Sequence, residues 1–521
     1  MGEMLRKFIQ HKQYIFLFLI IFLGAFLRLY KVSAVPPGLY IDEISDAYNG
    51  YEILTKGVDQ YGIKYPILFK AFGEYKMPMF VYTAAGSIAL FGRTDFAVRF
   101  PAIASGILTL LIFYFLVENL AEFTKKKLPF SSHNYALAAT LLLAISTWHI
   151  QFSRAGFDAT IALPFYLLGL LLSILAYKKE KSVLLLLSFI SLALTCYSYN
   201  AYRVFTPATF LVITIIFIFR KRQMLKGIIL SALLFMLLIL PVIMFSFTGA
   251  GMERFAQTSA FASYANLPLI QKIIHYPIIF LSNYLSFFSL NFLFNAGDGI
   301  GRHQMAGFGP MQYWEFPFLI IGLYFFIKKW KNPLFLTGLM ILLSVPFSAA
   351  TTIPSPHTLR SLPMIIPLTM MVAYGFLWTI KRLLRRKTII ILLIVFALIS
   401  YEFLFYLHSY YQHYPIINSI DWGAGNEEMV TETIKYQSKF QHIVVDGSLG
   451  AATIPLYFGF YTGDKLNPEI VSSSWQKPSN WQKGTTLYIR SYYGVKSDPS
   501  IIDSVYLPGQ NKDIFAEFQK I

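Results

Sequence analysis

Two adjacent carboxylates, Asp42 and Glu43, stand shortly after the first long apolar run of the chain, which ends near Leu29. Acidic side chains so close to lipid are costly unless a function or a partner compensates for them. A carboxylate here could act as a general base that takes the proton from an attacking hydroxyl group. The alternative is a helix N-cap, a role that Asp often has before a helical stretch. The residue types leave both open, and we take Asp42 as the leading catalytic candidate, with Glu43 beside it.

Isolated cations recur in the polar segments between the later apolar runs. Arg offers two parallel N–H donors that match a phosphate, so such cations could bind a desolvated phosphate group. The alternative is that each charged head reaches along the membrane surface to a lipid headgroup. Our candidates for phosphate binding are Lys76, Arg99, Arg154, Arg302 and Arg360.

The segment 295–310 is the most Gly-rich stretch of the chain. Glycines free a backbone to approach a ligand closely, but the segment lacks the spacing and the strand-to-helix context of a phosphate loop. A mobile flap over a cavity and an irregular loop fit it equally well. We expect a substrate cavity to be lined by Glu74, Asp158, Asp298 and His303.

The sequence predicts no metal site. An Asp-Glu pair can ligate a divalent cation, but residues 42 and 43 come without a defined third ligand. We therefore predict no cofactor, while a divalent cation stays compatible with the sequence.

The amino-acid composition indicates that most of the chain lies in a membrane. Of the 521 residues, 56% are hydrophobic and only 14% are charged. A transmembrane helix needs about 20 mainly apolar residues, and such runs recur from residue 14 to residue 408. The formal net charge of +17 does not indicate nucleic-acid binding, because many Lys and Arg residues form short clusters between the apolar runs. We expect about eleven crossings, near residues 13–29, 97–118, 134–150, 158–177, 182–199, 204–219, 226–246, 314–328, 332–349, 360–380 and 388–408.

The basic clusters predict the orientation. They fall near residues 6–12, 125–127, 178–181, 220–226, 328–331 and 381–387. When the chain is followed through the predicted spans, all of these clusters lie on the same side of the membrane. The positive-inside rule then places the N-terminus in the cytoplasm and the loops 30–99 and 247–313 outside. Two shorter apolar stretches, 77–90 and 278–294, would put later basic clusters on the opposite side if they crossed the membrane. We therefore expect them to form helices on the outer membrane surface.

The composition changes after residue 410, where polar residues, Gly, Pro and Trp appear and the apolar runs shrink to strand length. A helical pattern near residues 427–439 precedes the first short run, which favours a small α/β domain outside the cell. The expected fold is an all-α polytopic membrane protein with a small C-terminal α/β extracytoplasmic domain. We divide it into a transmembrane domain, 1–410, and an extracytoplasmic domain, 411–521.

These features together resemble the lipid-carrier-dependent glycosyltransferases of the GT-C fold, in the branch of the protein O-mannosyltransferases and the aminoarabinose transferases. The resemblance covers roughly the first third of the chain well, the Gly-rich loop loosely and the C-terminal domain hardly at all. The residues that carry it are Asp42-Glu43, Ala47, Gly57, Glu74-Tyr75-Lys76-Met77-Pro78, Phe91-Gly92, Ala97-Val98-Arg99-Phe100-Pro101 and the segment 149–158.

The resemblance implies an enzyme of the cell envelope, in the plasma membrane, that carries out glycosylation. It would be an inverting glycosyltransferase that moves a sugar from a polyprenyl-phosphate donor to an extracytoplasmic acceptor. Asp42 would be the base, and outer Arg or Lys residues would hold the carrier phosphate. The acceptor, whether protein, glycan or lipid, is not specified, and nucleic acid is not expected as a partner.

Two alternative functions compete with this one, and the first belongs to another class of protein. A transporter or flippase of a lipid-linked sugar would explain the many spans and the outer arginines, but transporters usually place ionisable residues within their helices near the membrane midplane. The central segments of this chain hold almost none. A polymerase or ligase of surface polysaccharide would share the lipid-linked donor but does not require an acidic pair in the first loop.

Overall fold

The computed structural model describes residues 2–124, 128–385, 388–472, 474–491, 498–509 and 513–521. The basic cluster at 125–127 and part of the one at 381–387 lie outside these ranges. The chain divides into two compact units, which we describe separately. Unit 1 comprises residues 1–30, 73–79 and 102–407, and unit 2 comprises residues 31–72, 80–101 and 408–521.

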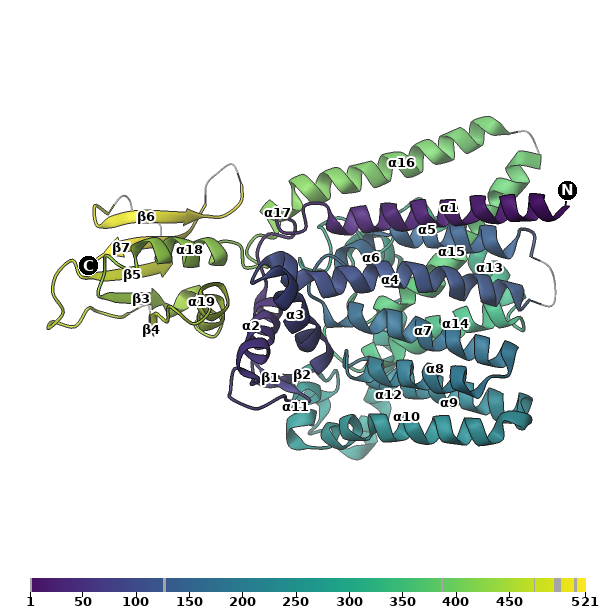
Figure 1. Cartoon of the computed structure of the whole chain (residues 1–521), viewed down its shortest axis with the longest axis horizontal. Coiled ribbons are helices and arrows are strands. Elements are labelled where there is room, and N and C mark those ends of the chain that lie inside the picture. Colours follow the sequence, from purple (N-terminus) through teal and green to yellow (C-terminus); the bar gives the residue numbers. More distant parts are fainter. Residues whose placement is uncertain (1, 125–127, 386–387, 473, 492–497, 510–512) are drawn as a thin grey trace. The chain divides into compact units, whose positions relative to one another are not determined.

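Unit 1 is a bundle of helices. Figure 1 shows α7, α8, α9 and α10 side by side, and α8 contacts each of the other three. The helices are α1 (Gly2–Leu29), α4 (Asp95–Glu122, which begins in unit 2), α5 (Ser132–Ile145), α6 (Thr147–Phe152), α7 (Asp158–Lys179), α8 (Ser182–Cys196), α9 (Tyr202–Arg220), α10 (Leu225–Ser246), α11 (Gly249–Thr258), α12 (Leu269–Ser286), α13 (Glu315–Lys328), α14 (Pro333–Ala349), α15 (Ile365–Arg385) and α16 (Ile389–Gln412). A short strand, β2 (Glu74–Lys76), also belongs to this unit.

The helices confirm the predicted multi-pass membrane protein. Among the described residues, six helices are long and apolar enough to span a bilayer, and α13 and α14 form one further candidate pair bent by 113°. Four shorter apolar helices accompany them, within α1, α3 (Pro78–Phe91), α5 and α8. The count of about eleven crossings stays a prediction.

The outer surface of the bundle is apolar. Leu230, Leu233 and Leu237 on α10 are 62%, 63% and 65% exposed, and only 11% of the most apolar window of α16 is buried. Such a surface would be unfavourable in water, whereas in hydrocarbon it costs nothing. A helix suits this solvent because it satisfies its backbone groups internally.

Two glycines allow α13 and α15 to pack in direct backbone contact. A Cβ atom added to Gly322 on α13 would lie 2.0 Å from the carbonyl oxygen of Met371, and one added to Gly375 on α15 would lie 2.0 Å from that of Phe318. Small residues at helix interfaces are how membrane helices gain van der Waals contact when no hydrophobic force between helices is available. These two positions therefore determine how closely α13 and α15 pack.

Unit 2 contains the first outer loop and the C-terminal segment. Its elements are α2 (Ile41–Lys56), β1 (Phe69–Ala71), α3, α17 (Tyr414–Ile417), α18 (Asn426–Tyr436), α19 (Ile454–Thr462), β3 (His442–Asp446), β4 (Glu469–Val471), β5 (Thr486–Ser491), β6 (Ile501–Tyr506) and β7 (Ile514–Lys520). The five C-terminal strands form one sheet in the order β4-β3-β5-β7-β6. Strand β3 pairs parallel with β4 and β5, and β7 pairs antiparallel with β5 and β6. The expected small α/β domain is confirmed.

The sheet shares its core with the loop that carries the acidic pair. Ile44 and Ala47 of α2 belong to the same buried cluster as Val445 of β3 and Phe458 of α19. The predicted domain boundary at residue 410 was based on the change in composition. Contacts in the structure instead group residues 31–72 with the C-terminal segment.

We expect Gly375→Leu to lower the free energy of unfolding by at least about 1–3 kcal/mol, because the new side chain must push α13 and α15 apart. The thermal unfolding midpoint of the purified full-length protein measures this. Gly86→Leu on α3 is the matched control, since a Cβ atom there meets nothing within 4 Å. Equal midpoints for the two variants would contradict the close packing.

Candidate active site and candidate metal centre

Asp42 lies in the first turn of α2, and its side chain is half-buried. The helix begins after Tyr40, which occupies the N-cap position, and the Tyr40 N–H donates to Oε2 of Glu43 at 3.3 Å. Asp42 is therefore not the capping residue, which was the alternative left open by the sequence. A carboxylate in the first turn is stabilised in its ionised form by the helix dipole.

Glu43, by contrast, is completely buried and paired with Arg99. The Arg99 Nε–H donates to Oε1 of Glu43 at 3.1 Å, and Nη2 donates to Oε2 at 3.3 Å. Both side chains have 0% exposure. A buried ion pair is tolerated only when its geometry is good and its remaining hydrogen-bonding groups are satisfied.

The rest of the Arg99 guanidinium binds the backbone of the segment before α2. Nη1 donates to the carbonyl oxygens of Val32 and Pro36 at 2.7 and 2.8 Å, and Nη2 donates to that of Gly38. These contacts and the two to Glu43 use all five N–H donors of an arginine. In this arrangement Arg99 fixes the segment 32–43 and has no N–H left for a phosphate.

The C-terminal segment holds α2 from another side. Asp464 accepts from Lys56 Nζ at 2.7 Å and from the Tyr48 hydroxyl at 3.0 Å, and the fully buried Trp422 ring packs edge-on against Tyr40. Burial raises the pKa of Tyr48, as do Glu52 and Asp464 nearby, so its hydroxyl remains a donor. The first turn of α2 is thus positioned by residues from distant parts of the chain.

The other predicted site residues lie in unit 1. Lys76 is buried on β2, next to the half-buried Glu74, and Asp158 begins α7. Arg154 is fully buried and donates from Nη1 to the carbonyl oxygen of Leu27 at 2.8 Å. Arg302 is half-buried, and its carbonyl oxygen accepts from Gln151 at 2.7 Å.

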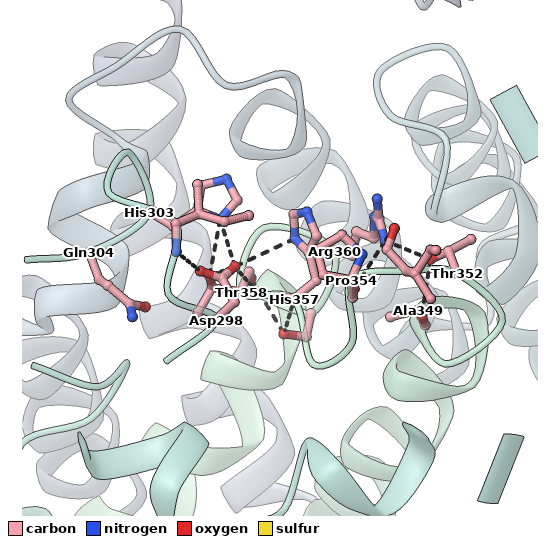
Figure 2. Close-up of polar contacts among 12 residues, drawn as sticks. Asp298, His303, Gln304, Ala349, Thr352, Pro354, His357, Thr358 and Arg360 are labelled. Atoms are coloured by element: carbon pink, nitrogen blue, oxygen red, sulfur yellow. Dashed lines mark hydrogen bonds and ion pairs between the residues drawn. The ribbon is translucent and has the colours of Figure 1, made fainter. Parts of the chain in front are cut away.

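Arg360 is held by its own loop. Its Nη1 donates to Oγ1 of Thr352 at 2.8 Å and to the carbonyl oxygen of Ile353 at 3.0 Å (Figure 2). Burial lowers its pKa, which a hydrogen bond with Tyr199 opposes. The guanidinium is thus fixed in direction and poorly solvated, two properties that suit an anion-binding group.

The two residues predicted from the Gly-rich loop, Asp298 and His303, come together in a buried polar cluster (Figure 2). Nδ1 of His303 lies 2.6 Å from Oδ2 of Asp298. The same oxygen accepts from the Thr358 N–H at 2.9 Å and from its hydroxyl, and Nδ1 of His357 is 3.8 Å away. The side chains of Asp298, His303 and His357 are 0%, 5% and 9% exposed.

The cluster keeps the carboxylate charged although it is buried. Burial by itself raises the pKa of Asp298, but the contacts with His303 and Thr358 and the nearby His357 hold that pKa well below its usual range. A buried carboxylate between two imidazoles is also a common donor set for a transition metal, above all zinc.

Ligand atoms of Asp298, His303 and His357 all lie within 4.8 Å of one another. Around a tetrahedral zinc ion such atoms are about 3.4 Å apart, and three protein ligands leave a fourth position for water or a substrate oxygen. A small closing of the cluster would therefore complete a metal site. Sequence reasoning missed His357 and Thr358, and their only signal was the presence of polar residues in the segment that follows α14.

Within each unit the structure joins some of the predicted site residues directly. Asp42, Glu43 and Arg99 belong to unit 2, where Glu43 and Arg99 are joined directly. Asp298 and His303 are joined in unit 1, where sequence reasoning also missed Arg28. Its Nη2 lies 2.5 Å from Nδ1 of His149, and it is fully buried at the end of α1.

The chain was also compared with known proteins. Residues 75–245 match the family model described as dolichyl-phosphate-mannose-protein mannosyltransferase. No curated protein sequence matches the chain.

Three solved structures of similar fold illustrate the likeness. ArnT from Cupriavidus metallidurans in the apo state has a TM-score of 0.54 at 11% identity, covering 98% of each chain. The same protein bound to undecaprenyl phosphate gives 0.54 at 10% identity and 97% of each chain. The Archaeoglobus fulgidus oligosaccharyltransferase in the apo form gives 0.51 at 12% identity over 89% of this chain, which spans 65% of the length of that enzyme.

The chain is therefore a multi-pass membrane protein with the GT-C fold, and the predicted resemblance is confirmed. The matches support a transferase rather than a flippase.

We expect Arg99→Gln to lower the free energy of unfolding by about 3–5 kcal/mol, because it leaves the buried Glu43 carboxylate without a cation. The double variant Arg99→Gln/Glu43→Gln should recover part of this loss, since both charges are gone. Thermal unfolding of the full-length wild type, the two single variants and the double variant measures the coupling. Strictly additive losses would show that the two side chains do not act as a pair.

We expect chelator-treated protein to bind about one equivalent of zinc through the Asp298 cluster, because it offers three ligands of the right type. His357→Gln should weaken binding at least about tenfold, the loss seen even for residues that only support a ligand. Calorimetric zinc titration measures the affinity. His275→Gln, on the exposed face of α12, is the control, and an equal affinity in both variants would rule the cluster out.

Proposed function

We propose that the protein is an inverting glycosyltransferase that moves a sugar from a polyprenyl-phosphate donor to an extracytoplasmic acceptor. The GT-C fold supports the reaction class. The observation that carries the proposal is Asp42, a half-buried carboxylate in the first turn of a helix whose start is fixed by the fully buried Glu43–Arg99 pair.

Asp42 is proposed as the general base. Its carboxylate takes the proton of an acceptor hydroxyl while that oxygen attacks the anomeric carbon of the sugar. The bond from that carbon to the phosphate oxygen breaks, and polyprenyl phosphate leaves with the bonding electrons. Attack from the face opposite the leaving group inverts the configuration at this carbon.

Glu43 and Arg99 are proposed as positioning residues instead of a second catalytic residue and a phosphate ligand. Their five shared and backbone hydrogen bonds hold the segment before α2, so the Asp42 carboxylate does not need to be ordered when substrate arrives. This role follows from the complete use of the Arg99 donors within unit 2.

The leaving phosphate needs fixed cations, because charge develops on it as the bond breaks. Lys76, Arg154, Arg302 and Arg360 are our candidates for this task in unit 1. Arg360 is favoured among them, because Thr352 and the Ile353 carbonyl group hold its guanidinium while burial reduces its hydration. Glu74, Asp158, Asp298 and His303 are proposed to line the substrate cavity.

The positive-inside rule supports an orientation with the N-terminus in the cytoplasm and the C-terminal domain outside the plasma membrane. In that orientation Asp42 faces acceptors outside the cell, such as protein, glycan or lipid. Because the C-terminal sheet shares its core with α2, an acceptor bound by this domain would be brought to the side of the base.

We expect Asp42→Asn to lower the transfer rate by about 10²–10⁴-fold, the usual contribution of a general base. Donor binding should be kept, because the amide has nearly the shape of the carboxylate. The measurement is transfer by the purified full-length protein from a panel of synthetic polyprenyl-phosphate sugars. Glu469→Gln, an exposed carboxylate on β4, is the control and should leave the rate unchanged.

A flippase makes the opposite prediction. If no donor of the panel is turned over, and Asp42→Asn equals the wild type in a lipid-scrambling assay, the enzyme proposal is wrong. If Asp42→Asn and the control Glu469→Gln lose transfer activity equally, the assignment of Asp42 as the base is wrong.

A further inference from the structure

A cavity of about 1180 Å³ lies within unit 1 between α4, α7, α9 and the bent α13–α14 pair. Its wall is mainly apolar and includes Leu170, Ile213 and Ile341. The volume exceeds the roughly 300–1,000 Å³ of most small-molecule sites. None of the residues proposed for glycosyl transfer lines it.

The depth of the cavity corresponds to one membrane leaflet. Its wall runs from Ala208 to Arg220 along α9 and from Tyr166 to Tyr177 along α7. At about 1.5 Å per residue these stretches are roughly 16–18 Å long, close to half of the roughly 30 Å hydrocarbon core. An extended acyl chain that enters from one surface would fill this depth.

The polar groups deep in the wall already have partners. The Tyr166 hydroxyl and Oγ1 of Thr209 are 3.0 Å apart, and the Ser173 hydroxyl donates to the Leu170 carbonyl oxygen at 2.7 Å. A satisfied wall does not require hydrogen bonds from a ligand. It therefore suits a hydrocarbon chain better than a sugar.

The mouth is positively charged. Arg220, Lys328 and Lys331 are exposed there, beside the 52% exposed indole of Trp330. Lys328 and Lys331 lie over the rings of Tyr324 and Trp330. Lys178 and Lys221, at the same end of the bundle, are instead paired with Glu122 and Glu180. The mouth thus offers cations and an interfacial tryptophan to a headgroup.

We infer that this cavity binds a phospholipid with an anionic headgroup, one acyl chain entering between α7, α9 and α14 and the phosphate lying among Arg220, Lys328 and Lys331. Basic pockets between membrane helices on the cytoplasmic side are known to bind such headgroups. The positive-inside rule places this end of the bundle on the cytoplasmic side. The inference does not depend on the proposed sugar transfer.

Lys329 has a different task. Its Nζ lies 3.1 Å from the Tyr374 hydroxyl and within 5.2–5.8 Å of the centres of the Phe325, Tyr374 and Phe335 rings. This contact ties the corner between α13 and α14 to α15, so Lys329 is left intact in the test.

The test titrates delipidated full-length protein in detergent with phosphatidylglycerol or phosphatidylcholine and counts bound lipids by native mass spectrometry. We expect one phosphatidylglycerol to bind before any other lipid. The variant Arg220→Gln/Lys328→Gln/Lys331→Gln should bind it roughly 100-fold more weakly, at about fivefold for each cation near an anionic lipid. Ala208→Phe, which fills the deep end, should weaken binding without changing the charge.

The control is Lys179→Gln/Lys181→Gln, which removes exposed cations at the same end of the bundle but away from the cavity. It should bind phosphatidylglycerol like the wild type. Equal losses in the control and in the triple variant, equal binding of phosphatidylcholine, or preferential retention of polyprenyl phosphate would each overturn the inference. If Ala208→Phe does not fold, the comparison of phosphatidylglycerol with phosphatidylcholine on the wild-type protein still tests the preference for an anionic headgroup.

Discussion

Hydrocarbon offers no hydrogen-bond partner to a peptide group, and the rest of this structure depends on that constraint. It requires the apolar segments to be helical and allows leucines on α10 to face outward. It also leaves tight packing as the means of helix association, which explains the direct backbone contact of α13 and α15 at Gly322 and Gly375. The same constraint makes a buried charge expensive, and the Arg99 and Asp298 side chains each have several partners.

Those partners show two ways of holding a buried charge. Arg99 is bound by Glu43 and three carbonyl oxygens, which neutralise it and leave a rigid segment ahead of α2. Asp298 is held by imidazoles and a threonine, and this set has donor atoms that a metal ion could take over. The contacts of Arg99 stabilise the segment before α2, whereas the Asp298 cluster has ligand atoms that could hold a metal ion.

The two lipid contacts that we propose differ in kind. We propose that the carrier phosphate meets cations in the outer loops such as Arg360, whose half-buried guanidinium is fixed by the backbone. The cavity at the basic end is instead wide, mainly apolar and bordered by the exposed Arg220, Lys328 and Lys331. Fixed donors suit a phosphate whose charge changes during a reaction, whereas an exposed basic rim suits a headgroup that only needs to be retained.

The sequence by itself determined that most of the chain lies in a membrane as a helical bundle and that a small sheet domain follows residue 410. Hydropathy and the length of apolar runs are local properties of the chain, so they can be recognised without the structure. The sequence also singled out Asp42, Asp298 and His303 as unusual residues. Only the tertiary structure decided that Glu43 and Arg99 neutralise each other and that His357 joins Asp298. It also joined α2 to the C-terminal sheet in one core. Each of these depends on contacts between residues more than 50 positions apart, and no local pattern of residue types specifies which distant partner a buried charge will meet.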